Sequence, residues 1–294
     1  MIFTVQVDNP KVINEALASS CNRIRFGPEF CEWKIADLKT LEATFSLTRE
    51  KGKEFAYVTP HVSSKSLEKL KEQLIYLNDQ GKTTVVVNDL GVLNQTEQLS
   101  NLKPYLGRQL ITALGRCPWK QITEFDVDRV ERGRVEKTFY QTSLNYEPTI
   151  QSFKENRIQG ADVDWIPQSF PYYDFLADNG LEYSIHLHSI PVTITRRCHM
   201  ARFLDVTNLE KCPRPCYTQA LRLKNEIINL DLFLHGNTVF RLTEPTQNDI
   251  NRLYKTKVSE FVITMSPLTK INTQKDIDAL IQKLTSKPTL SFFR

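Results

Sequence analysis

The apolar positions of this chain change their period from one segment to the next. Between Leu67 and Leu77, leucines recur every three or four residues, which places them on one face of a helix expected over residues 66–78. Residues 83–87 instead read Thr-Thr-Val-Val-Val, a continuous β-branched run that predicts a strand buried on both faces. Strands of this kind are typical of parallel sheets whose two faces are both covered.

Strand and helix patterns alternate in this way along most of the sequence. Further strands are expected at residues 22–26, 54–58, 109–113, 163–166, 183–187 and 261–264, and further helices at residues 35–50, 148–156, 172–178 and 277–284. Such alternation predicts βα units around a parallel sheet. The leading expectation is an α/β fold with one TIM-like (β/α) barrel, complete or irregular, and an open doubly wound sheet is the alternative.

Two stretches depart from this alternation. Residues 227–234 and 238–242 flank His235-Gly-Asn, which is a hairpin signal. Residues 115–136 are polar and poor in structural signals. The basic run at residues 129–134, which lies inside that stretch, is expected to be a solvated loop.

Length and composition agree with one large soluble domain. We expect a single barrel over residues 1–294, with a cysteine-bearing insertion at about residues 188–225. The net charge of +4 is too mild to predict nucleic-acid binding by itself. The sequence has neither an apolar run long enough to span a membrane nor a secretory signal, so a cytoplasmic protein is expected. The glycine-rich motifs of dinucleotide and P-loop sites are missing.

Three cysteines near the middle of the chain have the spacing of metal ligands. Cys212 and Cys216 form a Cys-x3-Cys pair whose inner prolines stiffen the loop, and Cys198 precedes them. Thiolates suit zinc or iron–sulfur clusters, and four of them suit either kind of site. Cys31 is the candidate for a fourth ligand. The residues alone leave a cluster, a zinc site and three unconnected cysteines open.

In a parallel barrel, chemistry collects at the carboxyl ends of the strands. Cys31, Asn88, Asp89 and the segment around Cys198 each follow a predicted strand, so they can converge on one face. The other two cysteines, Cys21 and Cys117, stand alone and are expected to be buried or free thiols.

Several polar residues could serve such a face. His186 and His188 are two apart and would share one face of a strand, and His188 is the candidate acid–base residue together with Asp89. Asn88 and Arg197 are candidate substrate-binding residues, Arg197 because a guanidinium pairs well with a carboxylate. The plainer alternatives are a buried strand histidine, side-chain capping of a turn and a surface arginine.

Several of these segments resemble the collagenase-like peptidase superfamily, and in particular its UbiV-like members. The matching segments are Arg25-Phe-Gly-Pro-Glu-Phe-Cys31, Gly52-Lys-Glu-Phe-Ala-Tyr-Val-Thr-Pro60, Val86-Val-Asn-Asp-Leu-Gly-Val92 and Ile190-Pro-Val-Thr-Ile-Thr-Arg-Arg-Cys198, followed by Cys212 and Cys216. Each segment is short, and their order and spacing together are specific. The resemblance covers roughly residues 20–220.

The resemblance implies a TIM-like barrel and a [4Fe–4S] cluster held by Cys31, Cys198, Cys212 and Cys216, with zinc as the alternative metal. It implies oxygen-independent hydroxylation, as in ubiquinone biosynthesis or RNA modification, with prephenate as the oxygen donor of several members. The chain would then act on a small molecule or RNA, either alone or as a cluster-binding subunit beside a homologous UbiU-like partner. Proteolysis is the alternative that the superfamily name raises, although the sequence has neither G-x-S-x-G nor H-E-x-x-H.

Overall fold

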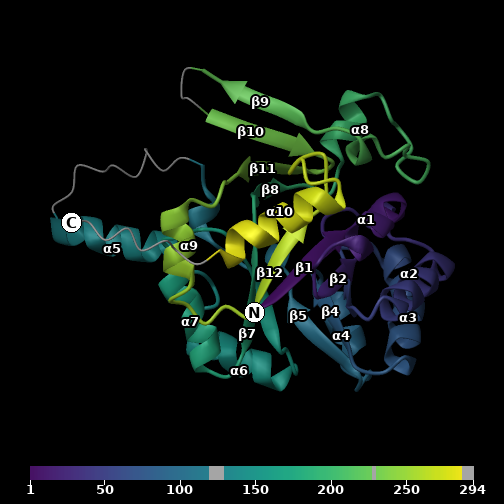
Figure 1. Ribbon diagram of the computed structural model, residues 1–294, viewed down its shortest axis with the longest axis horizontal. Helices are drawn as coiled ribbons and strands as arrows, with labels where there is room; N and C mark the ends of the chain where they lie inside the picture. The colour runs from purple at the N-terminus through teal and green to yellow at the C-terminus, as the bar shows by residue number, and fades with distance from the viewer. Residues whose placement is uncertain (119–128, 227–229, 287–294) are drawn as a thin grey trace.

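The central feature of the fold is a closed barrel of eight parallel strands, which the computed structural model describes with its surroundings over residues 1–118, 129–226 and 230–286 (Figure 1). In spatial order the strands are β1 (Ile2–Val7), β12 (Glu260–Thr264), β7 (Glu182–His186), β6 (Gly160–Asp164), β5 (Leu102–Leu106), β4 (Thr83–Val87), β3 (Glu54–Val58) and β2 (Arg23–Phe26). Neighbouring strands are parallel, and β1 closes the ring by pairing with both β12 and β2. The predicted α/β fold with a TIM-like barrel is confirmed, and the open doubly wound alternative is wrong.

Helices connect successive barrel strands, as the alternating pattern predicts. In chain order the helices outside the second sheet are α1 (Ile13–Ala18), α2 (Leu38–Glu50), α3 (Ser64–Asp79), α4 (Leu90–Thr96), α5 (Arg129–Tyr140), α6 (Glu147–Glu155), α7 (Phe170–Asp178), α9 (Gln247–Leu253) and α10 (Gln274–Thr285). Within the described residues, no helix has both the length and the apolar composition that crossing a membrane requires.

The strand β4 and the helix α3 show how the sequence pattern builds this arrangement. The three valines of β4 are completely buried, because one face of the strand looks into the barrel and the other is covered by helices. In α3, Leu70, Leu74 and Leu77 are completely buried as one stripe. Each such side chain contributes about 1.5–3 kcal/mol by leaving water. Ser63 begins the helix by accepting a hydrogen bond from the backbone N–H of Ser66.

The sequence pattern misplaces one strand of the barrel. The strand expected at residues 109–113 is wrong, because the barrel position is filled by β5, which ends at Leu106. The backbone N–H of Gly107 then donates to the carbonyl of Val87 at 2.7 Å, and the chain turns into the short helix η3 (Arg108–Leu110). β5 contains Pro104, a residue that argues against a central strand when only the sequence is known.

The basic segment expected to be a loop is helical. Residues 129–134 form the start of α5, and residues 130–134 are exposed to solvent. Glutamate and arginine have high helix propensities, so a solvated polar segment of this composition can form a helix without burying a face. Residues 119–128 of the polar stretch, and residues 227–229 of the expected hairpin, lie outside the described residues.

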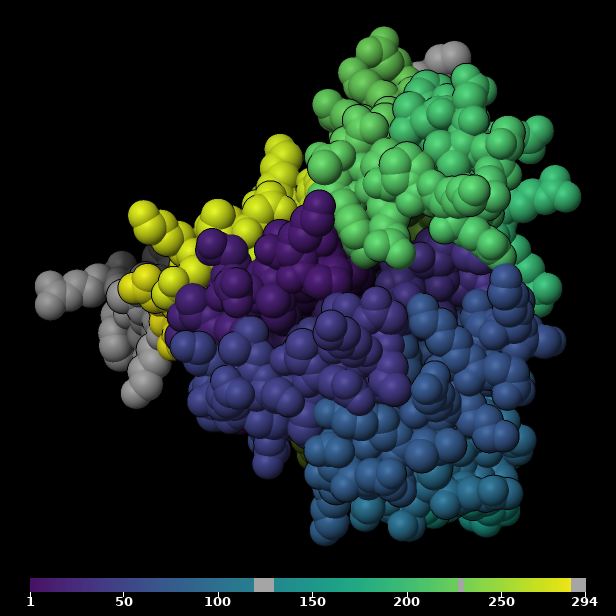
Figure 2. Space-filling model, turned by 90° about the vertical axis from the view of Figure 1, so that its right-hand side faces the viewer, coloured from purple at the N-terminus to yellow at the C-terminus, as the bar shows by residue number. Residues whose placement is uncertain are grey.

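A second, antiparallel sheet sits over the carboxyl end of the barrel. It contains β8 (Ser189–Ile194), β11 (Thr238–Leu242), β10 (Leu230–His235) and β9 (Leu221–Asn225), with α8 (His199–Phe203) and η6 (Pro215–Tyr217) between β8 and β9. The expected hairpin is present as β10 and β11, with Gly236 at a φ of 66° in the turn. The added segment therefore runs on to Leu242, past the expected boundary at about residue 225. Figure 2 shows this green segment resting against the purple and blue N-terminal part of the chain.

Candidate metal centre

Four cysteine side chains from three segments line one small cavity between the barrel and the second sheet. Cys31 lies between β2 and the short helix η2 (Glu32–Lys34), and Cys198 is the N-cap of α8. Cys212 lies in the loop that leads into η6, and Cys216 lies within η6. All four are free thiols. The structure therefore brings together the four cysteines that the sequence analysis grouped, including the distant Cys31.

Backbone N–H groups meet two of these sulfur atoms. The N–H of Ala201 donates to Sγ of Cys198 at 3.3 Å, and the N–H of Arg214 donates to Sγ of Cys212 at 3.4 Å. Arg214 has a φ of 56°, a left-handed conformation that is uncommon for residues other than glycine. Donors placed in this way stabilise the charge of a thiolate.

The turn of the β10–β11 hairpin joins two of the cysteine-bearing loops. The side-chain amide of Asn237 donates to the carbonyl oxygens of Phe30 and Thr195, at 2.8 Å in both cases. Phe30 directly precedes Cys31, and Thr195 lies shortly before Cys198. Asn237 therefore fixes the separation of two loops that approach the cavity from the barrel and from the second sheet.

The loop around Cys216 is fixed by contacts of its own. Nε2 of His235 lies 2.6 Å from the carbonyl oxygen of Cys216. Burial lowers the pKa of His235 to about 4, with Lys34 acting in the same direction, so the ring is neutral and donates its Nε2–H. The hydroxyl of Tyr217 donates to the carbonyl of Asp8 at 2.8 Å, which joins η6 to the end of β1.

Burial and one lysine set the electrostatics of the cavity. Burial raises the pKa of Cys31 to about 12, and it raises the pKa of Cys198 and Cys216 as well. Lys34 opposes all three shifts, and its own ammonium is held 2.6 Å from Oδ2 of Asp8. Without a metal these thiols keep their protons at neutral pH, so a metal that binds here displaces protons. Lys34 would then offset part of the thiolate charge.

The spacing of the thiols bears on the kind of centre they suit. Among the residues that the structure describes, no three His, Cys, Asp or Glu side chains come close enough together to hold a metal ion. A tetrahedral zinc site needs sulfur atoms about 3.8 Å apart, because each Zn–S bond is about 2.3 Å long. A [4Fe–4S] cluster binds each thiolate to a different iron, so its ligands surround a wider space. The four thiols therefore share a cavity without forming the close arrangement that a single ion requires.

Asn88 and Asp89 lie at the carboxyl end of β4, and they contact different neighbours. Asn88 is buried, donates to the carbonyl of Thr59 at 2.9 Å and accepts from the N–H of Gln109 at 3.1 Å. These bonds make it a link between the ends of β3, β4 and β5. Asp89 caps α4 through backbone N–H groups of its first turn, and its other oxygen lies 2.6 Å from Nδ1 of His61.

The structure does not bring His188 and Arg197 to the cysteines. His188 lies in the connection between β7 and β8 with a φ of 70°, and burial lowers the pKa of its imidazole. It lines none of the three hollows that adjoin the cysteines. Arg197 is exposed and is also outside these hollows, because the chain turns between it and Arg196, whose side chain does line one of them.

A larger hollow of about 280 Å³ opens on the other side of Cys31 and Cys198. We call it the His61 hollow, and its lining includes Cys31, Glu32, Trp33, His61, Arg196 and Cys198. Sequence reasoning missed His61. The signal was available, because His61 follows the strand expected at residues 54–58 just as Asp89 follows the next strand.

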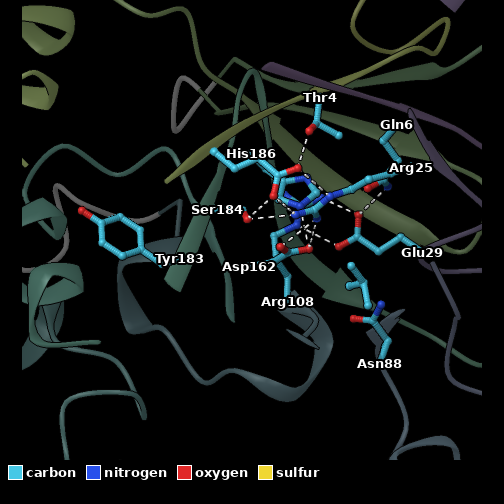
Figure 3. Close-up of polar contacts among 12 residues, drawn as sticks. Thr4, Gln6, Arg25, Glu29, Asn88, Arg108, Asp162, Tyr183, Ser184 and His186 are labelled. Carbon is cyan, nitrogen blue, oxygen red and sulfur yellow. Dashed lines mark hydrogen bonds and ion pairs between the residues drawn. The ribbon is translucent and has the colours of Figure 1, made fainter. Parts of the chain in front are cut away.

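The interior of the barrel is filled by paired charges, which the sequence analysis did not anticipate (Figure 3). Arg25 is completely buried, and its guanidinium donates to both oxygens of Asp162 at 2.8 Å, to Glu260 at 2.7 Å and to Ser184 at 2.8 Å. His186, the other histidine of the predicted pair, lies here with Nε2 3.0 Å from Asp162. Burial alone would raise the pKa of Asp162, but Arg25 and then His186 outweigh it and hold the pKa below its ordinary value.

A second set of ion pairs lies nearer the carboxyl end of the barrel. Arg108 pairs with Glu29 at 2.7 Å and with Asp164 at 2.9 Å, and Arg116 pairs with Asp164 at 2.6 Å. Burial works against the charge of Asp164, but Arg116 and Arg108 lower its pKa. Asp162 and Asp164 alternate with apolar residues along β6, which is the period of side chains that share one face of a strand.

Two solved structures are distantly similar to this chain. A thiamine phosphate pyrophosphorylase from Pyrococcus furiosus is 8% identical with a TM-score of 0.43, over 97% of this chain and 96% of that one. A mutant structure in complex with xylotriose is 11% identical with a TM-score of 0.38, over 90% of this chain and 84% of that one. No family model matches the sequence, and neither does any curated protein. Likenesses this distant carry no argument about chemistry.

Proposed function

We propose that this protein binds a [4Fe–4S] cluster through Cys31, Cys198, Cys212 and Cys216. The observation that carries the proposal is the shared cavity, because the fold brings Cys31, from the connection after β2, to three cysteines of the segment between β8 and β9. Unrelated buried cysteines would not be expected to line one space from three separate segments. The backbone donors to Cys198 and Cys212 support the same assignment, since hydrogen bonds to the sulfurs are one of the features that tune such clusters.

We further propose that the protein acts in oxygen-independent hydroxylation, either alone or as the cluster-binding subunit beside a homologous partner. This step rests on the sequence resemblance, which also assigns the oxygen to prephenate in several members. The His61 hollow supports it, because a space of about 280 Å³ beside two of the proposed ligands can hold a small molecule. When bound through four cysteines, the cluster would supply electron transfer. The chain itself would hold and orient the substrate beside it.

The test begins with anaerobic purification and analysis of iron, acid-labile sulfide and zinc. We expect about four irons and four sulfides per chain, with broad absorption near roughly 400 nm. Cys31→Ser should lose the cluster as fully as Cys216→Ser. Cys117→Ser is the matched control, because Cys117 is also a free, partly exposed thiol but does not line the cavity. Stoichiometric zinc without sulfide, or full cluster content in Cys31→Ser, would overturn the assignment.

A further inference from the structure

The His61 hollow contains a histidine whose orientation is fixed by a buried carboxylate. Nδ1 of His61 lies 2.6 Å from Oδ2 of Asp89, and the side chain of Asp89 is only 12% exposed, compared with 41% for His61. The carboxylate is itself held firmly. It accepts the backbone N–H groups of Gly91 at 2.7 Å, Val92 at 3.3 Å and Val62 at 3.2 Å.

These contacts decide which nitrogen of the ring carries the proton. A carboxylate that accepts three N–H donors is in its ionised, acceptor-only form, so the hydrogen between Asp89 and His61 belongs to Nδ1. In the neutral ring Nε2 is then an acceptor. Because Nδ1 is engaged, Nε2 is the atom left to meet a molecule in the hollow. A carboxylate in this position also stabilises the imidazolium that forms when Nε2 takes a proton.

The rest of the lining combines an aromatic side chain with charged and polar groups, which suits the binding of a small organic molecule. Trp33 provides an aromatic wall, and Arg196 provides a cation from the loop that follows β8. The carboxylate of Glu32 is bonded by both the backbone N–H and the hydroxyl of Ser63, at 2.9 and 2.7 Å. An apolar wall with a few convergent polar groups is the usual composition of a ligand site.

We propose that His61 is the acid–base residue of this hollow, with Asp89 as the residue that positions it. Nε2 of His61 accepts a hydrogen bond from a hydroxyl group of the bound molecule. When that oxygen is ionised, its O–H bond breaks and an Nε2–H bond forms, while the electron pair stays on the oxygen. The proton leaves to water through the exposed side of the ring. The role as substrate base rests on the proposed function, but the tautomer and the hydrogen bond do not.

The first test reads the tautomer by long-range ¹H–¹⁵N NMR of the full chain. The wild type should show His61 as the Nδ1–H form. Asp89→Asn keeps a good helix-capping residue but removes the charge that holds the Nδ1 proton, so His61 should leave that form. Asp37→Asn is the matched control, because Asp37 caps α2 in the same way at the surface, far from any histidine contact. A wild-type ring in the Nε2–H form would overturn the proposal.

The second test compares mandelate with phenylacetate, two acids that differ by one hydroxyl group. In the wild type and in Asp37→Asn, mandelate should bind about threefold to tenfold more tightly, which is the value of one hydrogen bond. In His61→Ala the two acids should bind equally, because the hydroxyl then has lost its partner. Equal binding in the wild type, or no binding of mandelate, would overturn the proposal, as would a preference for mandelate that survives His61→Ala.

Iron-loaded and iron-free protein should both be measured, so that this inference and the proposed function can fail separately. If a protein that never takes up iron still prefers mandelate, the cluster assignment is wrong and the proposed role of His61 stands. If the protein holds a full cluster but shows no preference for mandelate, the cluster assignment stands and the proposed role of His61 is wrong.

Discussion

Replacing Arg25 tests the view that the barrel interior is stabilised by compensated charge. Arg25→Met keeps much of the volume of the side chain but removes the guanidinium that donates to Asp162, Glu260 and Ser184. Two buried carboxylates would each lose their main partner. Neither would be left completely alone, because Arg23 lies 3.1 Å from Glu260 and His186 lies 3.0 Å from Asp162.

The expected cost follows from this geometry. Removing one partner of a buried ion pair typically destabilises a protein by about 3–5 kcal/mol, because the other charge stays buried without compensation. We expect a loss in this range, and not twice as much, because each carboxylate keeps one cationic or hydrogen-bonding neighbour. The loss is a large part of the total stability of a typical protein, which is about 5–15 kcal/mol.

The effect should also depend on pH, with a sign that the structure fixes. In the wild type the pKa values of Asp162 and Glu260 are lowered, so their contribution is complete above their ordinary values near 4 and is lost as the pH falls below them. In Arg25→Met burial is no longer outweighed and raises both pKa values. The folded variant then takes up protons more readily than its unfolded chain. The difference in free energy of unfolding between the wild type and Arg25→Met should therefore become smaller as the pH is lowered from 7 toward 4.5.

The assay is urea denaturation followed by circular dichroism and tryptophan fluorescence at pH 7 and pH 5. Arg222→Met is the control, because Arg222 pairs with Asp231 on the surface, and we expect no measurable shift of its midpoint. If Arg25→Met unfolds at the same urea concentration as Arg222→Met, the interior network is not a source of stability. A deficit that grows at pH 5 would show that the signs of the pKa shifts are wrong.

Two further predictions concern the loops around the candidate site. Asn237→Ala should lower stability by about 1–3 kcal/mol in the same assay, because two carbonyl groups lose their donor, and it should lower iron content while leaving the cysteines intact. Gly107→Ala should cost about 1–3 kcal/mol, because its Cβ would lie 2.2 Å from Oδ1 of Asn88. Gly133→Ala is the control, because Gly133 lies in α5 and a Cβ there would have no atom within 4 Å. Its stability should be unchanged or higher, since alanine favours a helix more than glycine does.

The sequence predicts the outer layers of this fold better than its inner surface. Strand β4 and helix α3 follow from runs of valine and leucine, because both elements bury apolar side chains in the hydrophobic core. Strand β1 is not among the expected strands, although Phe3, Val5 and Val7 alternate with polar residues as in a strand. Its inward positions are Thr4 and Gln6, where a barrel core would be expected to be apolar. A barrel lined by polar groups breaks the pattern that identifies a buried strand.

The candidate site was predictable to the extent that it depends on residue type. Cysteine is rare and its spacing is informative, so the four thiols could be grouped before their positions were known. The neighbours that fix them could not be found in this way. Asn237 acts through two backbone carbonyls, and Lys34 acts through a carboxylate from β1. Such partners come from other segments of the chain and meet only in the folded structure, so no local pattern encodes them.

The two polar regions of this molecule are suited to different tasks. Asp162, Asp164 and Glu260 each have a guanidinium within 3 Å, which lowers their pKa values, so they are held as carboxylates and are poor proton acceptors. His61 at the rim instead lines a hollow and has a partly exposed side chain, so a ligand can reach it. We therefore expect the charged interior to contribute stability, and a ligand to bind at the rim between the barrel and the second sheet.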